Sequence, residues 1–211
     1  MSPNEPNPAS RAPRRTKDDV VDAALSLLDR VGLPDLSMRR LADDLGIQPS
    51  AIYWHVASKQ ELLAAVSGRI LAPVVLRPGD PSDLAGAAVA LGHRLHDRLL
   101  AHRDGAEVVS SSLALGLTPS PLHDALAELD DSPAARVVAD AVTHYVVGFT
   151  FHEQQRRSAD AWGTAASAVS LTAASFTDTG DDGFVAALEL IAGGIGSWRT
   201  GAQATKTTGP R

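Results

Sequence analysis

The chain has 211 residues, of which 44 % are hydrophobic and 21 % charged, and its formal net charge is −6. This composition supports a folded core and excludes a disordered chain, while the absence of cysteine excludes disulfides and thiolate metal sites. No apolar run approaches the roughly 20 residues of a membrane span, and the polar, proline-rich start of the chain lacks the pattern of a signal peptide. We therefore expect a cytoplasmic protein with no membrane partner.

The negative charge is unevenly distributed along the chain. Residues 1–60 contain 8 Lys and Arg side chains and 8 Asp and Glu side chains, so the net charge of −6 arises entirely beyond them. Within this first part, basic side chains gather between Arg11 and Lys17 and again at Arg39 and Arg40. Phosphate binding requires a local basic face rather than a basic protein. The charge pattern therefore permits nucleic-acid binding without predicting it by itself.

Apolar residues recur at helical spacing along most of the chain, and patterns typical of strands are almost absent, which predicts an all-α fold. In the N-terminal part, the expected helices begin at capping residues and end at glycine or proline. A polar tail, residues 1–13, precedes them. These helices are expected over residues 16–31, 37–45, 48–54 and 58–72.

A segment rich in proline and polar residues, 76–82, marks the clearest internal break in the pattern. Beyond it, further helices are expected over residues 83–101, 106–115, 119–130, 134–157, 159–174 and 182–199. The chain is accordingly divided into a disordered tail, a small helical domain, a larger helical domain and a second disordered tail, which cover residues 1–13, 14–72, 73–199 and 200–211.

The segment from Leu36 to Lys59 has the pattern of a helix-turn-helix. Gly46 can supply the positive φ that a tight turn between two helices requires, and the small Ala42 lets the helices approach each other closely. The helix that begins at Gln48 is then the recognition helix, whose N-terminal residues reach base edges in the major groove of DNA.

The side chains on and around this helix suit contact with DNA. Gln48 and Ser50 can exchange hydrogen bonds with base edges, and Ala51 can contact a thymine methyl group. A lysine at the start of the next helix can hold a phosphate together with backbone N–H groups. The predicted DNA contacts are Arg39, Gln48, Pro49, Ser50, Ala51, Tyr53, Trp54, His55 and Lys59.

A plain three-helix packing unit, with the aromatic rings in its core, is the alternative interpretation of this segment. The run Tyr53-Trp54-His55 points three rings in different directions around a helix, which a core does not need. We therefore favour the DNA-binding interpretation.

Residues 17–70 resemble the DNA-binding domain of the TetR family of bacterial repressors, most closely in the run Ile52-Tyr-Trp-His-Val-Ala-Ser-Lys-Gln-Glu-Leu-Leu63. Residues 101–106, 143–148 and 188–194 are similar to landmarks in the effector domain of tetracycline repressors. The resemblance implies a three-helix helix-turn-helix DNA-binding domain joined to a larger helical domain for effector binding and dimerisation. It also implies a homodimeric transcription regulator, most simply a repressor, that leaves a palindromic double-stranded operator when a small molecule binds.

Tetracycline repressors hold their drug and its magnesium ion with polar residues, and the resemblance places Leu91, Leu95, Val109 and His152 at such positions. These replacements predict an apolar pocket without a metal ligand, and hence an apolar or aromatic effector and no cofactor. Pro49 stands where those repressors have a base-reading glutamine, so a different operator is expected. The predicted pocket consists of Leu91, Leu95, Val109, Tyr145, Phe149 and His152.

The last expected helix carries apolar residues at alternating spacings of four and three, which is typical of a helix–helix seam. In the family resembled, this helix and the one over 134–157 form a four-helix bundle with their symmetry mates. The alternative is that both apolar stripes face only the chain's own core. The predicted dimer contacts are Tyr145, Phe184, Leu188, Ile191, Ile195 and Trp198.

Two other functional classes were weighed. One is a ligand-binding or sequestering protein whose helix-turn-helix no longer binds DNA. The other is an all-α enzyme, but no set of catalytic side chains can be assembled from the sequence. His152-Glu153 begins like a zinc-protease helix, yet Arg156 stands where the second histidine is required, so no metal site is predicted.

Overall fold

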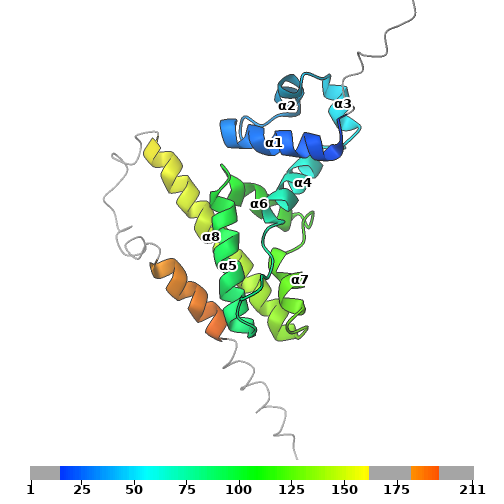
Figure 1. Cartoon of the computed structure of the whole chain (residues 1–211). Helices are drawn as coiled ribbons and strands as arrows, with labels where there is room; N and C mark the ends of the chain where they lie inside the picture. Colours follow the sequence, from blue (N-terminus) through cyan, green and yellow to red (C-terminus); the bar gives the residue numbers. More distant parts are fainter. Residues whose placement is uncertain (1–14, 162–181, 195–211) are drawn as a thin grey trace, which may run out of the picture.

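The computed structural model describes residues 15–161 and 182–194. Within these residues every regular element is a helix (Figure 1), which confirms the predicted all-α class. None of the helices in this part of the chain is both long and apolar enough to cross a bilayer.

The N-terminal domain is built from four helices: α1 (Lys17–Val31), α2 (Met38–Leu45), α3 (Pro49–Tyr53) and α4 (Lys59–Leu71). Local side-chain caps fix where these helices begin. Thr16 Oγ1 accepts a hydrogen bond from the Asp19 N–H, while the Asp19 carboxylate accepts one from the Thr16 N–H, a complete capping box. The apolar faces of these helices meet in a core that includes Val20, Ala24, Leu28, Leu41, Ile52 and Val66.

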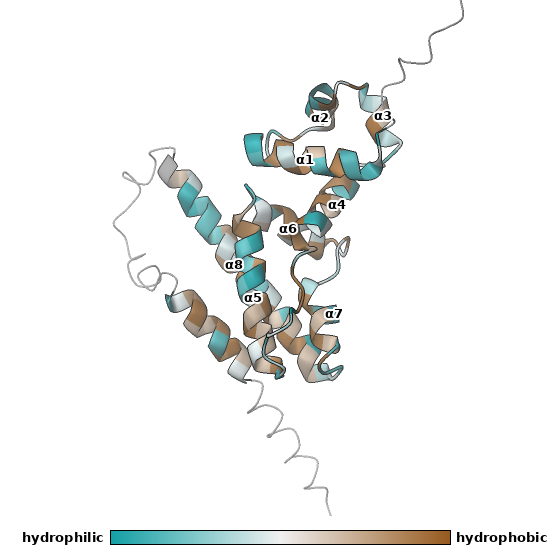
Figure 2. Cartoon of the chain, in the orientation of Figure 1, coloured by the Kyte–Doolittle hydropathy of each residue, from teal (hydrophilic) through white to brown (hydrophobic). Residues whose placement is uncertain are grey.

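The larger domain contains α5 (Leu84–Leu100), α6 (Gly105–Ala114), α7 (Pro121–Ala127), α8 (Pro133–Ala161) and a helix over residues 182–194. The long α8 packs against α5, α6 and α7, and α4 reaches out of the N-terminal domain to pack on α6 (Figure 1). Figure 2 shows that the C-terminal end of α8 is hydrophilic, whereas the 182–194 helix is largely hydrophobic. The helix α4 is therefore the main covalent and packed connection between the two domains.

Most predicted helices lie within a few residues of their expected bounds, but α8 corrects one boundary. The sequence predicted a break near residue 158, whereas α8 continues to Ala161. Residues 153–161 contain no glycine or proline, and Arg157 pairs with Glu153 one turn earlier at 2.6 Å, which supports the helix across the expected break. Most of the helix expected over 159–174, and both terminal tails, lie outside the described residues. The division into domains stays a prediction.

Candidate DNA-binding surface and effector groove

The turn between α2 and α3 adopts the geometry that the sequence predicted. Ser37 Oγ caps α2 by accepting from the Arg40 N–H, and α2 ends at Gly46 with φ 66° and ψ 33°, in the left-handed region. The Ile47 N–H then donates to the Ala42 carbonyl at 3.0 Å and closes the turn. Because a side chain at this φ would be strained, Gly46 is what allows α3 to follow α2 so closely.

The short helix α3 presents its polar and aromatic side chains away from the core. Pro49 occupies its first turn, and the side chain of Gln48, at the N-cap position, makes no capping hydrogen bond. Ile52 is completely buried, whereas Tyr53 and Trp54 are 51 % and 89 % exposed. Exposure of these two rings contradicts the alternative in which they form the core of a plain packing unit.

The nine predicted DNA contacts are all exposed or half-buried. Lys17 pairs with Glu61 at 3.1 Å and Arg40 with Asp35 at 3.5 Å. Within residues 15–161 and 182–194, by contrast, Arg39 is in no ion pair. A cation without a carboxylate partner keeps its full charge for phosphate. The role of these residues stays a prediction, and their exposure is consistent with it.

The start of α4 differs in one bond from the expected capping box. Ser58 Oγ accepts from the Glu61 N–H at 3.1 Å, as predicted, but the Glu61 carboxylate accepts from the Ala57 N–H at 2.7 Å instead of the Ser58 N–H. This hydrogen bond, followed by the one from Lys17, lowers the pKa of Glu61. The effect is to fix the chain between the exposed rings of α3 and the first turn of α4.

The residues predicted to line the effector pocket lie in different environments, and their role stays a prediction. Leu91, Leu95 and Val109 are completely buried in the core, and His152 is exposed with its ring against Phe151. We expected an open pocket in which apolar side chains replace the polar ones. Instead, apolar side chains at these positions pack against their neighbours and close the space.

A cavity does lie nearby, in a groove between α6 and α8 of about 250 Å³. His144 Nδ1 lies 2.7 Å from the Asp140 carbonyl, so it carries the proton and donates, and Nε2 is left as an acceptor. A β-carbon added at Gly148 would meet nothing within 4 Å, so the groove is open there. None of the six predicted pocket residues lines this groove, which sequence reasoning missed. Its lining consists of Ser110, Leu113, Ala114, Thr143, His144, Val147, Gly148 and Phe151.

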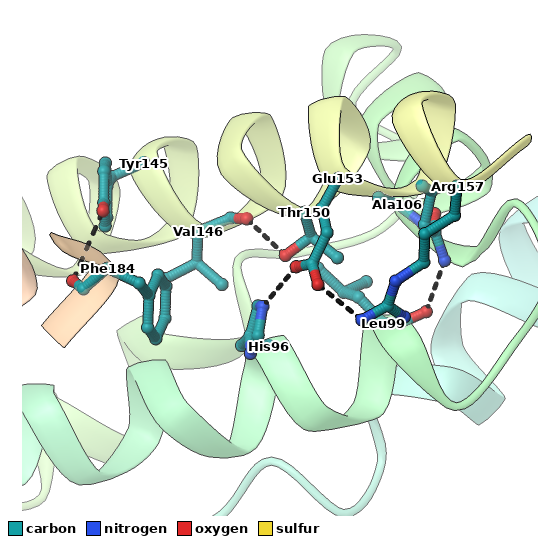
Figure 3. A network of polar contacts seen from close by, with 10 residues as sticks. His96, Leu99, Ala106, Tyr145, Val146, Thr150, Glu153, Arg157 and Phe184 are labelled. Carbon is teal, nitrogen blue, oxygen red and sulfur yellow. Dashed lines mark hydrogen bonds and ion pairs between the residues drawn. The ribbon is translucent and has the colours of Figure 1, made fainter. Parts of the chain in front are cut away.

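The predicted residues Tyr145 and Phe149 belong to a different feature, a cluster of rings that fastens the 182–194 helix onto α5 and α8. Figure 3 shows three of its members, His96, Tyr145 and Phe184. The rings of His96 and Phe184 stack with centroids 4.4 Å apart, and His96 Nε2 lies 2.9 Å from Glu153. The Tyr145 hydroxyl donates to the Phe184 carbonyl, and burial raises the pKa of this tyrosine.

This cluster corrects the predicted dimer seam. Phe184 and Leu188 are buried in the chain's own core, and a β-carbon at Gly92 would come within 2.8 Å of the Leu188 side chain. These two residues therefore follow the alternative that was weighed for the seam. Ile191 is half-buried, and Ile195 and Trp198 lie outside the described residues. The exposed apolar side chains on the same two helices are Val137 and Leu190, at 56 % and 76 %.

The chain is similar in sequence to bacterial regulatory proteins. A family model described as "Bacterial regulatory proteins, tetR family" matches residues 20–66. The tetracycline repressor protein class E of Escherichia coli is 34 % identical over 152 residues, which are 67 % of this chain and 70 % of that protein.

Solved structures extend the similarity to most of the chain. The crystal structure of BioQ from Mycobacterium smegmatis has a TM-score of 0.73 and 36 % identity, over 87 % of this chain and 98 % of that one. BioQ bound to its double-stranded DNA operator has a TM-score of 0.59 and 38 % identity, over 72 % and 94 %. The similarity thus covers both domains.

Proposed function

The chain belongs to the tetR family of bacterial regulatory proteins and is a DNA-binding transcription regulator, and we propose that it is a cytoplasmic repressor released by a small molecule. Its partners are double-stranded operator DNA, a small-molecule effector and a second copy of the chain. The observation that carries the proposal is the exposure of Tyr53 and Trp54 on a helix that Gly46 holds at the end of a helix-turn-helix. We propose no catalytic activity.

Each side chain around α3 has a chemical role in the proposed complex with DNA. Gln48 and Ser50 read base edges, and Ala51 packs on a thymine methyl group. Arg39 and Lys59 bind phosphates, which positions the domain without reading sequence. The aromatic residues Tyr53, Trp54 and His55 lie against the sugar-phosphate backbone, and Pro49 fixes the first turn of α3.

Two copies read two half-sites of a palindrome, which a helix-turn-helix dimer contacts about 34–36 Å apart. Since Phe184 and Leu188 are occupied within the chain, the partner packs on the outer faces of α8 and the 182–194 helix. Val137 and Leu190 support this assignment, because they are large apolar side chains that the folded chain leaves exposed on these two helices.

The groove between α6 and α8 is the proposed effector site. Leu113, Val147 and Phe151 give it an apolar lining, and Ser110, Thr143 and His144 add a few polar atoms. That combination suits a small apolar or aromatic compound with one or two hydrogen-bonding groups. A volume of about 250 Å³ restricts it to a small ligand. The name of the class E relative supports a drug-like effector. Leu91, Leu95 and Val109, however, stand where polar residues are expected to hold tetracycline.

Fluorescence anisotropy with the DNA upstream of the protein's own gene tests the proposal. We expect saturable binding to a palindromic site, with an affinity that falls steeply as salt rises. Weakening this affinity a hundredfold requires about 2.7 kcal/mol of coupling from the effector. Absence of a preferred site, or binding insensitive to salt, contradicts the proposal and favours the sequestering protein weighed from the sequence.

A further inference from the structure

The turn between α5 and α6 holds the DNA-binding domain against the effector domain. The Asp29 carboxylate, near the end of α1, accepts from the Arg103 N–H and lies 3.1 Å from His102 Nδ1. Asp104 Oδ2 accepts from the Leu33 N–H at 2.7 Å. Gly32 lies so close to this turn that a β-carbon there would be 2.9 Å from Asp104 Oδ2. These contacts tie the C-terminal end of α1 to the effector domain, in addition to the packing of α1 on α4.

Asp104 makes this contact from an unfavourable backbone conformation. Its φ is 54°, and it is the only residue other than glycine with a positive φ in the part of the chain that the structure describes. It occupies the N-cap position of α6 but makes no capping hydrogen bond. A carboxylate at this position normally caps its own helix, whereas here it reaches across to Leu33. Residues held in such a conformation persist only when their surroundings fix them.

Gln154 on α8 makes the hydrogen bond to the first turn of α6 that the Asp104 side chain does not make. Its Oε1 accepts from the Ala106 N–H at 3.1 Å, in the first turn of α6, and its Nε2 donates to the carbonyls of Leu99 and His102, both at 2.9 Å. One amide side chain thus satisfies three backbone groups on the two sides of the turn. Leu99 and Ala106 lie together beside this part of α8 (Figure 3).

The same helix lines the proposed effector groove. Phe151 and Val147 precede Gln154 by about one and two helical turns, so all three move together when α8 moves. A ligand that enters between α6 and α8 changes the distance between these helices, and Gln154 is the α8 side chain that hydrogen-bonds to the start of α6. A path from the groove to the end of α1 therefore passes through these hydrogen bonds, beside the direct packing of α4 on α6.

We infer that Gln154 is a positioning residue that keeps the turn of residues 99–106 in the form in which Asp104 holds α1, and so sets operator affinity. The inference rests on the proposed function. It requires Gln154 and Asp104 to act in series, because the hydrogen bonds of Gln154 go to Leu99, His102 and Ala106, all within the effector domain.

Anisotropy with the operator, on the full-length protein and five variants, tests the inference. Gln154→Leu keeps the size of the side chain and removes all three hydrogen bonds, and Asp104→Ala removes the bond to Leu33. Each is expected to weaken operator binding about tenfold, and the double variant about tenfold as well, since both changes break one path. Asp104→Asn keeps an acceptor and tolerates the left-handed conformation, so it should bind like the wild type. Gln155→Leu, at the exposed neighbouring position, is the matched control and should also be unchanged.

Independent effects on folding predict a different pattern. If the double variant is weakened about a hundredfold, or Gln154→Leu binds like the wild type, the inference is overturned. If Gln154→Leu does not fold, as judged by its circular dichroism melting curve, Gln154→Glu replaces it. This variant keeps the acceptor for Ala106 but cannot donate to Leu99 or His102, and the same tenfold and non-multiplying losses are required of it. Failure of the wild type to bind any site contradicts the proposed function instead.

Discussion

The two domains use their aromatic side chains in opposite ways. In the DNA-binding domain, Tyr53 and Trp54 lie at the C-terminal end of the five-residue helix α3 and are exposed to solvent. Ile52 is the buried side chain that packs α3 against its neighbours. In the effector domain, the rings of Phe149 and Phe184 contact each other and His96 in a cluster that holds three helices together. We therefore propose that the exposed rings Tyr53 and Trp54 belong to the DNA-binding surface, whereas the clustered rings belong to the core. Stability and binding should therefore respond separately to mutations in the two sets.

The largest expected effect is on the stability of the effector domain. Phe184→Ala removes a buried ring that contacts His96, Tyr145 and Phe149, and truncation of a buried phenylalanine costs about 3–5 kcal/mol of unfolding free energy. Urea unfolding followed by circular dichroism measures this loss. Glu189→Ala on the same helix is the control, since Glu189 is exposed and its truncation should change the unfolding free energy by about 0.5 kcal/mol or less. A loss below 1 kcal/mol for Phe184→Ala contradicts the role of the cluster.

The reverse pattern is expected on α3. Trp54→Ala removes a ring that is already in solvent, so the unfolding free energy should stay within about 0.5 kcal/mol of the wild type. Operator affinity should fall about tenfold, the effect of losing one good interfacial contact. Anisotropy and urea unfolding on the same preparation separate the two quantities. Loss of stability together with unchanged DNA binding would mean that the ring of Trp54 packs in the fold. It would contradict the contrast between the two domains.

The stability of the DNA-binding domain should depend on pH, because carboxylates cap its helices. The hydrogen bond from the Ala57 N–H lowers the pKa of Glu61 below its usual 4.5, and the one from the Thr16 N–H lowers that of Asp19 below 3.8. A lowered pKa in the folded state means that each group stabilises the fold above its unfolded pKa, and that this stabilisation disappears as pH falls through the folded value.

Glu61→Gln tests this dependence. The amide oxygen can still accept from Ala57, but it does not titrate, so the variant is less stable than the wild type at pH 7. The difference in unfolding free energy should shrink as pH falls below about 4.5, the usual glutamate value. Unfolding experiments between pH 7 and 2 measure it. If the difference in unfolding free energy between the wild type and Glu61→Gln stays constant with pH, the prediction is contradicted.

The sequence predicted the N-terminal domain closely because its structure is encoded locally. Ser37, Gly46 and Ser58 each determine a helix end through bonds that span a few residues, and such patterns are visible in a sequence. The effector domain is different. Whether Leu91 lines a pocket or fills a core depends on how α5 and α8 pack, and Phe184 is 35 residues from Phe149 in the chain although their rings are 5.0 Å apart.

The predicted pocket came from the resemblance, which does not reveal how side chains of a different size and polarity pack. At Leu91, Leu95 and Val109 the apolar replacements let the core close. The groove beside Gly148 carried a weak sequence signal, a glycine in the interior of an expected helix, which often marks close packing or an open surface. The glycine was assigned to the dimer helix, and only the packing of α6 on α8 reveals the groove.

The smallest expected effect concerns this glycine. A β-carbon at Gly148 would meet no atom within 4 Å, and alanine is preferred over glycine in a helix interior by about 1 kcal/mol. Gly148→Ala should therefore raise the unfolding free energy by about 0.5–1 kcal/mol and leave operator affinity unchanged. Gly92→Ala is the matched comparison, because its β-carbon would lie 2.8 Å from the Leu188 side chain and should destabilise the protein. Opposite signs for the two variants support an open groove on α8 and a packed face on α5. If both destabilise, the partner subunit fills the groove and the effector binds elsewhere.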